Sequence, residues 1–494
     1  MLRPDSWQST TEYRAILKKK IKKLRKNMLH DIKKYKDIIS KMENLSLDAA
    51  RKSLVTLYSS TGRPAKNQAQ ILRSLILFTL LLGKTAAKFS LTSWVNVELP
   101  SSPLFIALIG CDNAESLPPL GSYYDFMNRC WQGDRSKYSR NYAMPAGKNG
   151  KKPKKNIGDD GKLEEESSYK TKPLSDDLIA GKPITDNPES ILQDIFFQTA
   201  VMPSARLGLV DTANLTLSGD GTAVPSHNCP FGRHILSNSD EELRHYNDPD
   251  ASWGYDSSKK TWYFGFSLYM LCCRNPHLKV ELPLSISFTT ARRHDSINFL
   301  YAYDHFSRHC HGIVPKNICL DSAHDNIPTY RLLDHFKINA LIDINGRCNS
   351  SSIAPDDVTL DKEGKPYCMY GKKMVPWGND PQKDAHKYRC PFKCGRIDSC
   401  PHAKECCGNG KYGRTVYIKN NGDLRFNTRI PRGSEEFKRI YRERTACERV
   451  NNRVLNDYQL QYLRIRGIDH FSFWAMLIGI CIHLDARCKT AVIN

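Results

Sequence analysis

The chain has 494 residues, and 73 lysines and arginines against 52 aspartates and glutamates give it a formal net charge of +21. This length accommodates two or three domains with cores of their own, and a charge of this sign favours a polyanionic partner, either nucleic acid or an anionic membrane surface. A membrane-spanning helix is not expected, because no stretch approaches the roughly 20 apolar residues that one needs, and the N-terminus MLRPDSWQST lacks an apolar signal core.

Residues 1–60 are predicted to form a basic amphipathic helical arm. Between residues 16 and 39 apolar side chains recur at steps of three and four, the spacing of one helix face, and KKKIKKLRK fills residues 18–26. The basic face is either simply solvated or binds a DNA backbone or a second copy of the chain.

Residues 61–142 are predicted to form a helical N-terminal domain that binds DNA. The apolar run ILRSLILFTLLLG (71–83) carries Arg73 and is interpreted as a buried helix, and SPLFIALIGC and GSYYDFMNRCW predict further helices. Residues 143–200 then change to a polar, charged, Gly- and Pro-rich composition. Such a composition cannot bury a core, so this segment is predicted to be a linker.

Residues 201–345 together with 434–494 are predicted to form an α/β domain. Apolar or β-branched runs bounded by turn residues predict strands at 215–224, 261–273, 280–290, 317–323 and 339–345. Helical patterns cover 295–310 and 327–336, and an apolar helix near 470–484 closes the chain. This order predicts a sheet that begins as a meander and continues with alternating helices and strands.

Two aspartates in this domain occupy unusual positions. Asp220 lies within a strand-like run between two glycines, and Asp321 ends another apolar strand. Charged residues in buried strands are uncommon unless they are paired or bind a cation. Either aspartate alone fits a turn or an ion pair, but together they favour a Mg²⁺ site, since carboxylate oxygens suit that hard cation. RRHDS (292–296) follows the third strand, so His294 and Asp295 either face the same site or begin a helix.

A third carboxylate is expected from the helix predicted at 441–453, YRERTACERVNNR. At about 100° per residue, Tyr441, Arg444, Glu448 and Asn452 fall on one face. Glu443 points elsewhere, so Glu448 is the glutamate that shares a face with an arginine and a tyrosine. An ordinary salt-bridged helix gives the same spacing.

The sequence resembles the DDE transposases of bacterial insertion sequences, whose signature is Tyr-x2-Arg-x3-Glu-x6-Lys. Tyr441, Arg444 and Glu448 match its first three positions, while the fourth falls at Leu455, with Arg453 nearby. The resemblance extends to GDGT around Asp220, to LDSAHD around Asp321, to the closing RVLNDYQLQYLRIRG and to GRPAKNQAQILRSLILFTLL before the core. It covers most of residues 60–485.

This resemblance implies a ribonuclease H-like mixed-sheet catalytic core and a two-metal phosphoryl transfer. Asp220, Asp321 and Glu448 would hold two Mg²⁺ or Mn²⁺ ions, and the chain would cleave transposon ends and join their 3′-hydroxyl groups to target DNA. It also implies double-stranded DNA as partner, a homodimer on DNA, no membrane, and a cytoplasmic, nucleoid-associated location in a bacterium. Residues expected to contact DNA are Tyr441, Arg444, Arg449, Asn452 and Arg453, because arginine forks bind phosphate oxygens well.

A Cys-rich insertion is predicted at 346–433. The 17 cysteines of a chain without a signal core are expected to be reduced, and clustered ones favour metal ligands over disulfides. In YRCPFKCGRIDSCPHAKECCG, the cysteines 390, 394, 400 and 406 are spaced x3, x5 and x5. Cys390, Cys394, Cys400 and Cys406 therefore predict a structural Zn²⁺ site, with free thiols or an iron–sulfur cluster as alternatives.

Two other functions remain open from the sequence. One is a catalytically inactive, domesticated DNA-binding protein derived from such an enzyme. The other is a ribonuclease H-like nuclease that never joins strands. Metal-dependent nicking of DNA distinguishes the first from a transposase, and strand-transfer products distinguish the second.

Overall fold

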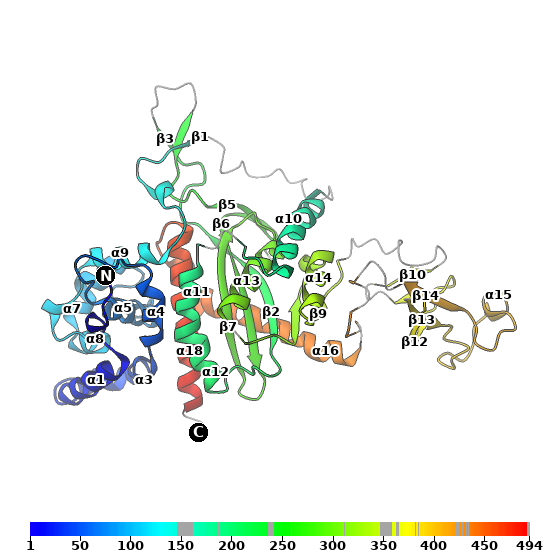
Figure 1. Ribbon diagram of the computed structural model, residues 1–494, viewed down its shortest axis with the longest axis horizontal. Coiled ribbons are helices and arrows are strands. Elements are labelled where there is room, and N and C mark those ends of the chain that lie inside the picture. The colour runs from blue at the N-terminus through cyan, green and yellow to red at the C-terminus, as the bar shows by residue number, and fades with distance from the viewer. Residues whose placement is uncertain are drawn as a thin grey trace. The chain divides into compact units, whose positions relative to one another are not determined.

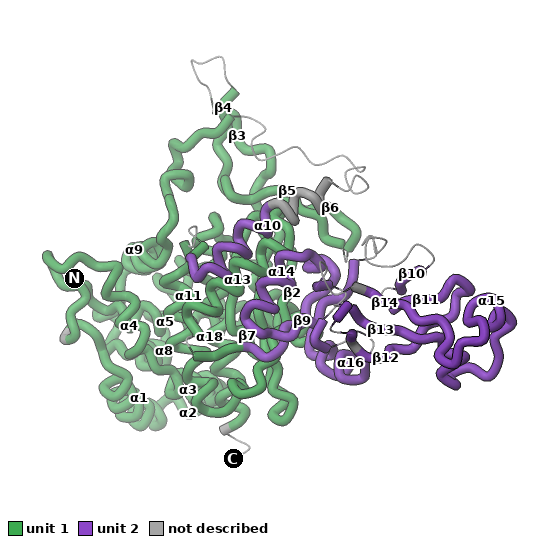
Figure 2. Tube along the Cα trace, turned by 45° about the vertical axis from the view of Figure 1, so that its right-hand side comes forward, with its two compact units in different colours: residues 1–161, 183–314, 445–494 green, residues 162–182, 315–444 purple. Residues whose placement is uncertain are grey.

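The structure is a computed structural model in which the chain forms two compact units (Figure 2). Unit 1 comprises residues 1–161, 183–314 and 445–494, and unit 2 comprises residues 162–182 and 315–444. The described residues are those of 1–491 except 146–161, 185–187, 236–241, 258, 311, 346–357, 362–364, 381, 384, 420–423, 426–427, 431 and 433.

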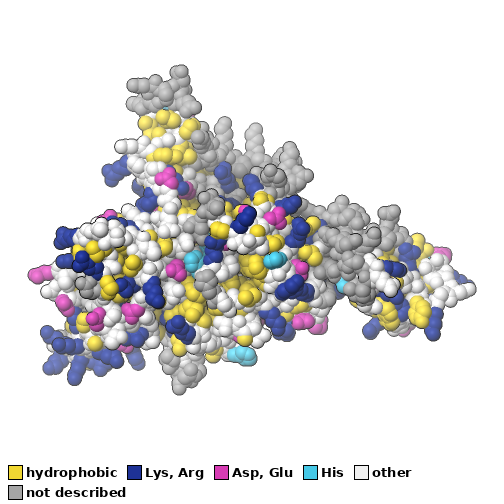
Figure 3. All heavy atoms as spheres, in the orientation of Figure 1, with side chains coloured by type: hydrophobic (Ala, Val, Ile, Leu, Met, Phe, Trp, Pro, Cys, Tyr) yellow, Lys and Arg dark blue, Asp and Glu magenta, His cyan; other side chains and the backbone are white. Residues whose placement is uncertain are grey.

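The N-terminal part of unit 1 is helical. Its helices are α1 (Thr10–Leu24), α2 (Leu29–Lys34), α3 (Lys36–Asn44), α4 (Asp48–Val55), α5 (Gln68–Leu80), α6 (Leu91–Ser93), α7 (Leu99–Ser101), α8 (Pro103–Ile109) and α9 (Leu120–Cys130). The single helix expected over 16–39 is therefore wrong, because the chain breaks between α1 and α2. Lysines at i and i+4 repel each other in this segment, and Asn27 is a weak helix former. Most of the lysines stay exposed, and basic side chains gather at the lower left of Figure 3, where Figure 1 places α1, whereas Lys20 is partly buried and pairs with Asp112.

Helix α5 is buried along nearly its whole length, as its apolar sequence predicts. The charged side chain within it, Arg73, is 1% exposed. Its guanidinium lies 3.9 Å from the ring centre of Tyr13 and donates to the carbonyl oxygen of Gln8 at 3.1 Å. Burial lowers the pKa of Arg73 to about 10, which still leaves it charged at neutral pH. Arg73 thus holds the segment before α1, which contains Gln8, against the helical core.

Unit 1 contains an antiparallel sheet in which β6 pairs with three other strands. Its strands are β2 (Thr216–Pro225), β5 (Ser252–Asp256), β6 (Thr261–Asn275) and β7 (Val280–Thr290). The register places Asp220 opposite Met270 and Gly221 opposite Tyr269. The three predicted strands 215–224, 261–273 and 280–290 are therefore confirmed within one or two residues.

Helices cover both faces of this sheet. On β7, Ser285 donates to the carbonyl oxygen of Ala302 in α13 (Asp295–His309), whereas the neighbouring Ile286 packs against Gly479 of α18 (Ile468–Ala491). Successive strand residues point to opposite faces, so α13 and α18 lie on opposite sides, as Figure 1 also shows. Coverage on both faces explains why β6 and β7 are buried along most of their length, β6 as a mainly apolar run and β7 with small hydroxyl side chains between its apolar residues.

Helix α18 is the one helix among the described residues that is long and apolar enough to cross a membrane. The expectation that no stretch approaches the length and composition of a spanning helix is therefore wrong for residues 468–490. In the structure 94% of its apolar window is buried inside the protein, as expected of a core helix. Phe471 contributes to this core by packing against Phe266 and Phe288, with ring centres 5.0 and 5.7 Å away.

The segment predicted as a linker, 143–200, lies partly outside the described residues. Its described part contains helices α10 (Lys162–Ile179) in unit 2 and α11 (Ser190–Phe196) in unit 1, and α12 (Met202–Arg206) follows. Leu192 and Phe196 of α11 are buried. A short apolar stripe at the end of a polar segment was thus enough to form a packed helix.

A second, small sheet of unit 1 has the order β1–β4–β3. Its antiparallel strands are β1 (Met144–Pro145), β3 (Arg233–Ile235) and β4 (Leu243–His245). No strand was predicted here from the sequence, because each is only two or three residues long.

Unit 2 begins with an α/β part. The parallel strands β8 (Asn317–Leu320) and β9 (Asn339–Ile342) flank helix α14 (Ile327–His335) in sequence, and α16 (Glu435–Tyr441) follows later. Cys319, Leu341, Phe437 and Ile440 share one apolar cluster, so α16 packs against both strands. With antiparallel strands in unit 1 and a parallel pair here, the chain has the mixed α/β class predicted from its sequence.

The remainder of unit 2 is the Cys-rich segment. Its elements are β10 (Thr359–Leu360), β11 (Pro366–Tyr367), β12 (Val375–Asp380), β13 (Ala385–Arg389), α15 (Ala403–Cys407) and β14 (Thr415–Lys419). Strands β12, β13 and β14 form an antiparallel sheet over a small cluster that includes Cys368, Met374 and Ile418.

Candidate active site

Asp220 lies in the middle of β2 and is half-buried. Its Oδ2 accepts a hydrogen bond from Nδ2 of Asn451 at 3.2 Å. Asn451 is 6% exposed, and its own Oδ1 is buried without a hydrogen-bond partner among the described residues. The amide of Asn451 therefore helps to orient the carboxylate of Asp220, which remains within reach of solvent.

Asn451 belongs to α17 (Thr445–Asn452), which packs on β2, β6 and β7. Cys447, one turn earlier, is buried, and its Sγ contacts the carbonyl oxygen of Met270 at 3.4 Å. Burial, with smaller contributions from the Cys272 thiol and the Asp220 carboxylate, raises the pKa of Cys447. Cys447 and Asn451 thus define the face of α17 that rests on the sheet beside Asp220.

Glu448 is the exposed residue next to this face. It precedes Asn451 by three positions, and residues three apart are neighbours on a helix surface. Because Asn451 contacts Asp220, Glu448 lies on the strip of α17 adjacent to that aspartate. Glu448 thus lies on the helix that contacts Asp220, and its part in a shared site stays a prediction.

A further carboxylate, Asp295, lies against β2. A Cβ atom added to Gly221 would be 2.4 Å from Asp295 Oδ1, so the absence of a side chain at Gly221 permits this approach. Asp295 is in the first turn of α13, and the residue that caps this helix is His294, whose Nδ1 accepts from the Ser296 backbone. The sequence left open whether His294 and Asp295 face the site or begin a helix. The structure shows that they begin a helix. Asp295 lies on the face of the sheet toward which Gly221 points, opposite the face on which Asp220 meets Asn451.

Asp321 follows β8 directly in unit 2 and is half-buried. Its Oδ1 accepts from the backbone nitrogen of Ala323 at 3.1 Å and lies 2.6 Å from Nδ1 of His324. Burial alone would raise the pKa of Asp321, but the hydrogen bonds and charge of His324, the Ala323 amide and the charge of Arg444 outweigh it and lower the pKa. Asp321 is therefore ionised at neutral pH.

Tyr441 and Arg444 also belong to unit 2. The Tyr441 hydroxyl donates to Asp343 Oδ2 at 2.7 Å and contacts the Leu320 carbonyl oxygen at 3.0 Å, and the Arg444 guanidinium lies 6.0 Å from the Tyr441 ring centre. Both residues therefore surround the end of β8 where Asp321 lies.

The continuous helix predicted over 441–453 is wrong. Helix α16 ends at Tyr441, a 3₁₀ turn covers Arg442–Arg444, and α17 starts at Thr445. A 3₁₀ turn advances about 120° per residue, so the face drawn at 100° per residue loses its phase there. Glu443 lies near Cys319, where its charge adds to the rise in that thiol's pKa that burial causes.

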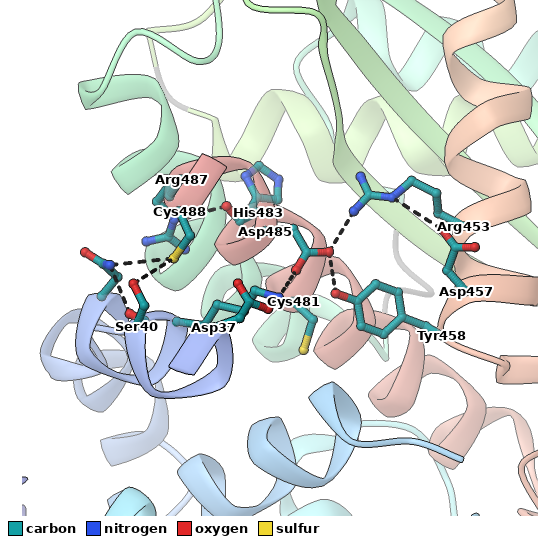
Figure 4. A network of polar contacts seen from close by, with 12 residues as sticks. Asp37, Ser40, Arg453, Asp457, Tyr458, Cys481, His483, Asp485, Arg487 and Cys488 are labelled. Atoms are coloured by element: carbon teal, nitrogen blue, oxygen red, sulfur yellow. Dashed lines mark hydrogen bonds and ion pairs between the residues drawn. The ribbon is translucent and has the colours of Figure 1, made fainter. Parts of the chain in front are cut away.

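The other residues predicted to contact DNA differ in their surroundings. Arg449 pairs with Glu281 at 2.6 Å, and Asn452 is exposed and accepts from Asn456 at 2.6 Å. Arg453 belongs to a network around Asp485 of α18, to which it donates at 2.8 Å (Figure 4). Their contacts with DNA stay predictions, and for Arg449 and Arg453 such a contact would compete with an ion pair inside the protein.

No group of three or more His, Cys, Asp or Glu side chains among the described residues is arranged to hold a metal ion. Cys390, Cys394, Cys400 and Cys406 thus form no such group, and the structure gives no support to zinc. Asp220, Asp321 and Glu448 form no such group either, so their metal site stays a prediction. Burial raises the pKa of the Cys390 thiol, and a hydrogen bond with Cys407, which was not in the predicted set, adds to the rise. The tip of the segment is held instead by Tyr370, which stacks on His402 at 3.9 Å and donates to Glu405 at 2.7 Å.

The chain has a mixed α/β fold, a net charge of +21 and half-exposed carboxylates. These features fit the class of DNA-processing enzymes. Residues 367–485 match the family model described as a transposase DDE domain. This match confirms the resemblance to DDE transposases, and it contains Tyr441, Arg444 and Glu448, while Asp220 and Asp321 lie before it. A comparison with curated proteins gave no match.

Proposed function

We propose that the chain is a transposase that cleaves the ends of a mobile DNA element and joins the 3′-hydroxyl ends to target DNA. Asp220, Asp321 and Glu448 would carry the phosphoryl transfer on a ribonuclease H-like core. The observation that carries the proposal is the contact between Asp220 and Asn451, because it joins one carboxylate to the helix that bears Glu448. The transposase DDE domain match over 367–485 supports the same assignment.

The donor chemistry of these residues fits Mg²⁺ or Mn²⁺. The site offers carboxylate oxygens, which hard cations prefer, and beside Asp220 the unpartnered amide oxygen of Asn451 is a further acceptor for a cation or its hydration water. Two bound ions would activate the attacking hydroxyl and stabilise the leaving oxygen. Within the protein, Asn451 orients Asp220, while His324 and Arg444 keep Asp321 ionised.

The proposed partners follow from the same assignment. The net charge of +21 favours double-stranded DNA, since each phosphate contact releases counterions. Two element ends must be brought together before joining, so we infer a homodimer on DNA. If the element is a bacterial insertion sequence, the protein would act at the nucleoid in the cytoplasm.

The test is a nicking and joining assay with labelled duplexes taken from the DNA that flanks the gene, with and without Mg²⁺. Asp220→Asn, Asp321→Asn and Glu448→Gln should each abolish both products and leave DNA binding largely intact. Glu436→Gln is the matched control, because Glu436 is an exposed carboxylate on α16.

The alternatives predict different products. Wild-type protein that binds the duplex but never nicks it would be a domesticated DNA-binding protein. Protein that nicks but yields no joined strands would be a nuclease of the same fold.

A further inference from the structure

A cavity of about 580 Å³ in unit 1 lies beside the small sheet β1–β4–β3. Arg140, Arg233, Arg466 and His245 contribute to its lining, and none of the described residues that line it is acidic. Its volume falls within the range of about 300–1,000 Å³ that is typical of ligand sites, so it accommodates more than a single inorganic ion.

The three arginines come from distant parts of the chain and make no ion pair or hydrogen bond through their side chains with another described residue. Their neighbours differ in this respect. Arg135 pairs with Asp469 at 2.7 Å, and Lys137 pairs with Asp250 at 2.5 Å. Like charges collected in one cavity repel each other unless an anion joins them. Within the described part of the chain no acidic side chain supplies the counter-charge of these arginines, so an external anion fits this cavity.

A buried carboxylate fixes the backbone near two of these arginines, Arg233 and Arg466. Asp248 is 2% exposed and accepts from the backbone nitrogen of Gly467 at 2.8 Å and from Asn228 Nδ2 at 2.7 Å, and it also accepts from the Ser226 hydroxyl. These bonds join the loop that ends in Arg466 to the loop that leads into β3 and Arg233.

A second contact joins the same two loops. Nε2 of His227 lies 2.6 Å from the carbonyl oxygen of Gln461, on the same two loops. Loops held in place before binding lose less conformational freedom when the ligand arrives. The cavity is thus preorganised, with arginine forks that suit phosphate oxygens in bidentate geometry.

We propose that this cavity binds consecutive backbone phosphates of a DNA duplex, as a contact separate from the carboxylates that would perform the chemistry. The inference rests on the proposed function for the identity of the polyanion. Phosphate contacts position a duplex without reading its sequence. The site therefore fits DNA of any sequence.

The test measures the affinity of the full chain for a fluorescent duplex of arbitrary sequence over a range of salt concentrations. Arg233→Ala and Arg466→Ala should each weaken binding and reduce the slope of log affinity against log salt by about 0.9. Arg466→Lys should keep the slope, because the charge remains, but bind more weakly, because the fork is lost. Arg206→Ala removes the same charge from an exposed position on α12, at the far end of unit 1 in Figure 1, and should change neither quantity.

Titration of pyrophosphate into the wild-type protein tests whether the cavity binds a small phosphate ligand or the phosphates of a DNA backbone. Pyrophosphate that binds while the two alanine variants keep the wild-type salt slope would make the cavity a small-anion site and overturn the inference. Wild-type slopes in both variants without pyrophosphate binding would overturn it as well. Asp220→Asn should retain the wild-type slope. Failure of the proposed function would be recognised differently: the wild-type protein would bind DNA through this cavity but would not nick it.

Discussion

Asn451 donates its side-chain amide to Asp220, with 3.2 Å between Nδ2 and Oδ2, and thereby links helix α17 to strand β2. Helical spacing predicts the neighbouring Asn452 on the face of Glu448, but in the structure Asn452 is exposed. Asn451 is thus a positioning residue that the signature motif does not contain. Its effect on the site would be exerted through the orientation of Asp220.

Asn451→Ala should lower DNA nicking by roughly 10–100-fold, as is typical when a residue that orients a metal ligand is lost. It should also raise the Mg²⁺ concentration needed for half-maximal activity, which a merely structural role would not change. Asn456→Ala is the control, because it removes an exposed amide just after α17 from a residue outside the predicted site, and it should nick normally. Equal losses in both variants would contradict the assignment.

Arg444→Gln should move the acid limb of the nicking profile to higher pH. The charge of Arg444 is one of the contributions that lower the pKa of Asp321 against the effect of burial, so its removal raises that pKa. Asp321 would then need a higher pH to ionise. Arg444→Lys should keep the limb in place. An unchanged limb together with a flatter salt dependence of DNA binding would instead make Arg444 a phosphate contact.

Gly221→Ala should destabilise the protein through Asp295. The new Cβ atom would lie 2.4 Å from Asp295 Oδ1, and crowding of this kind typically costs about 1–3 kcal/mol. Asp295→Ala removes the obstacle, so Gly221→Ala should cost little in that background. Urea denaturation of both single variants and the double variant measures this coupling, and additive losses would show that the two residues do not contact each other.

The protein should lose stability as the pH falls below about 6.5, in part through His483 (Figure 4). Its ring is fully buried between Ser204 and the Pro283 carbonyl oxygen, and burial lowers its pKa from 6.5 to about 3. Between pH 3 and pH 6.5 the unfolded chain therefore binds a proton at His483 more readily than the folded chain does. The stability that neutral His483 contributes above pH 6.5 is lost as the pH falls.

At pH 5 the loss due to His483 amounts to about 2 kcal/mol, since each pH unit is worth about 1.36 kcal/mol. His483→Gln should be less stable than wild type at pH 7 and should show a shallower decline between pH 7 and pH 5 in urea denaturation. A decline as steep as that of the wild type would assign the acid sensitivity to other groups, of which the buried His305 is the first candidate.

The strands of unit 1 could be predicted because their burial leaves a strong pattern. Strand β6 reads TWYFGFSLYMLCC over most of its length, and its residues are apolar on both faces because α13 covers one face and α17 and α18 the other. Helix α5 was equally clear, although nothing in the sequence indicates that its arginine reaches Gln8 and Tyr13.

The features that could not be predicted depend on local geometry or on long-range contacts. The 3₁₀ turn at Arg442–Arg444 shifts the helical phase that sequence spacing assumes, which is why Asn452 was chosen over Asn451. The cavity of Arg140, Arg233 and Arg466 joins residues more than 200 positions apart, and the strands beside it are too short to leave a periodic pattern.

Helix α18 is made last of the helices in unit 1, and this affects how the unit folds during translation. It packs against α3, α5, α11 and β7, so elements from the first three hundred residues have their apolar surfaces covered by residues 468–491. Domains generally fold in turn as they leave the ribosome, N-terminal ones first, but unit 1 cannot complete its core until this helix has been made. The nascent chain therefore carries uncovered apolar surface for most of its translation and is expected to need chaperones. A product that stops before α18 should be degraded rather than survive as a competitor for DNA.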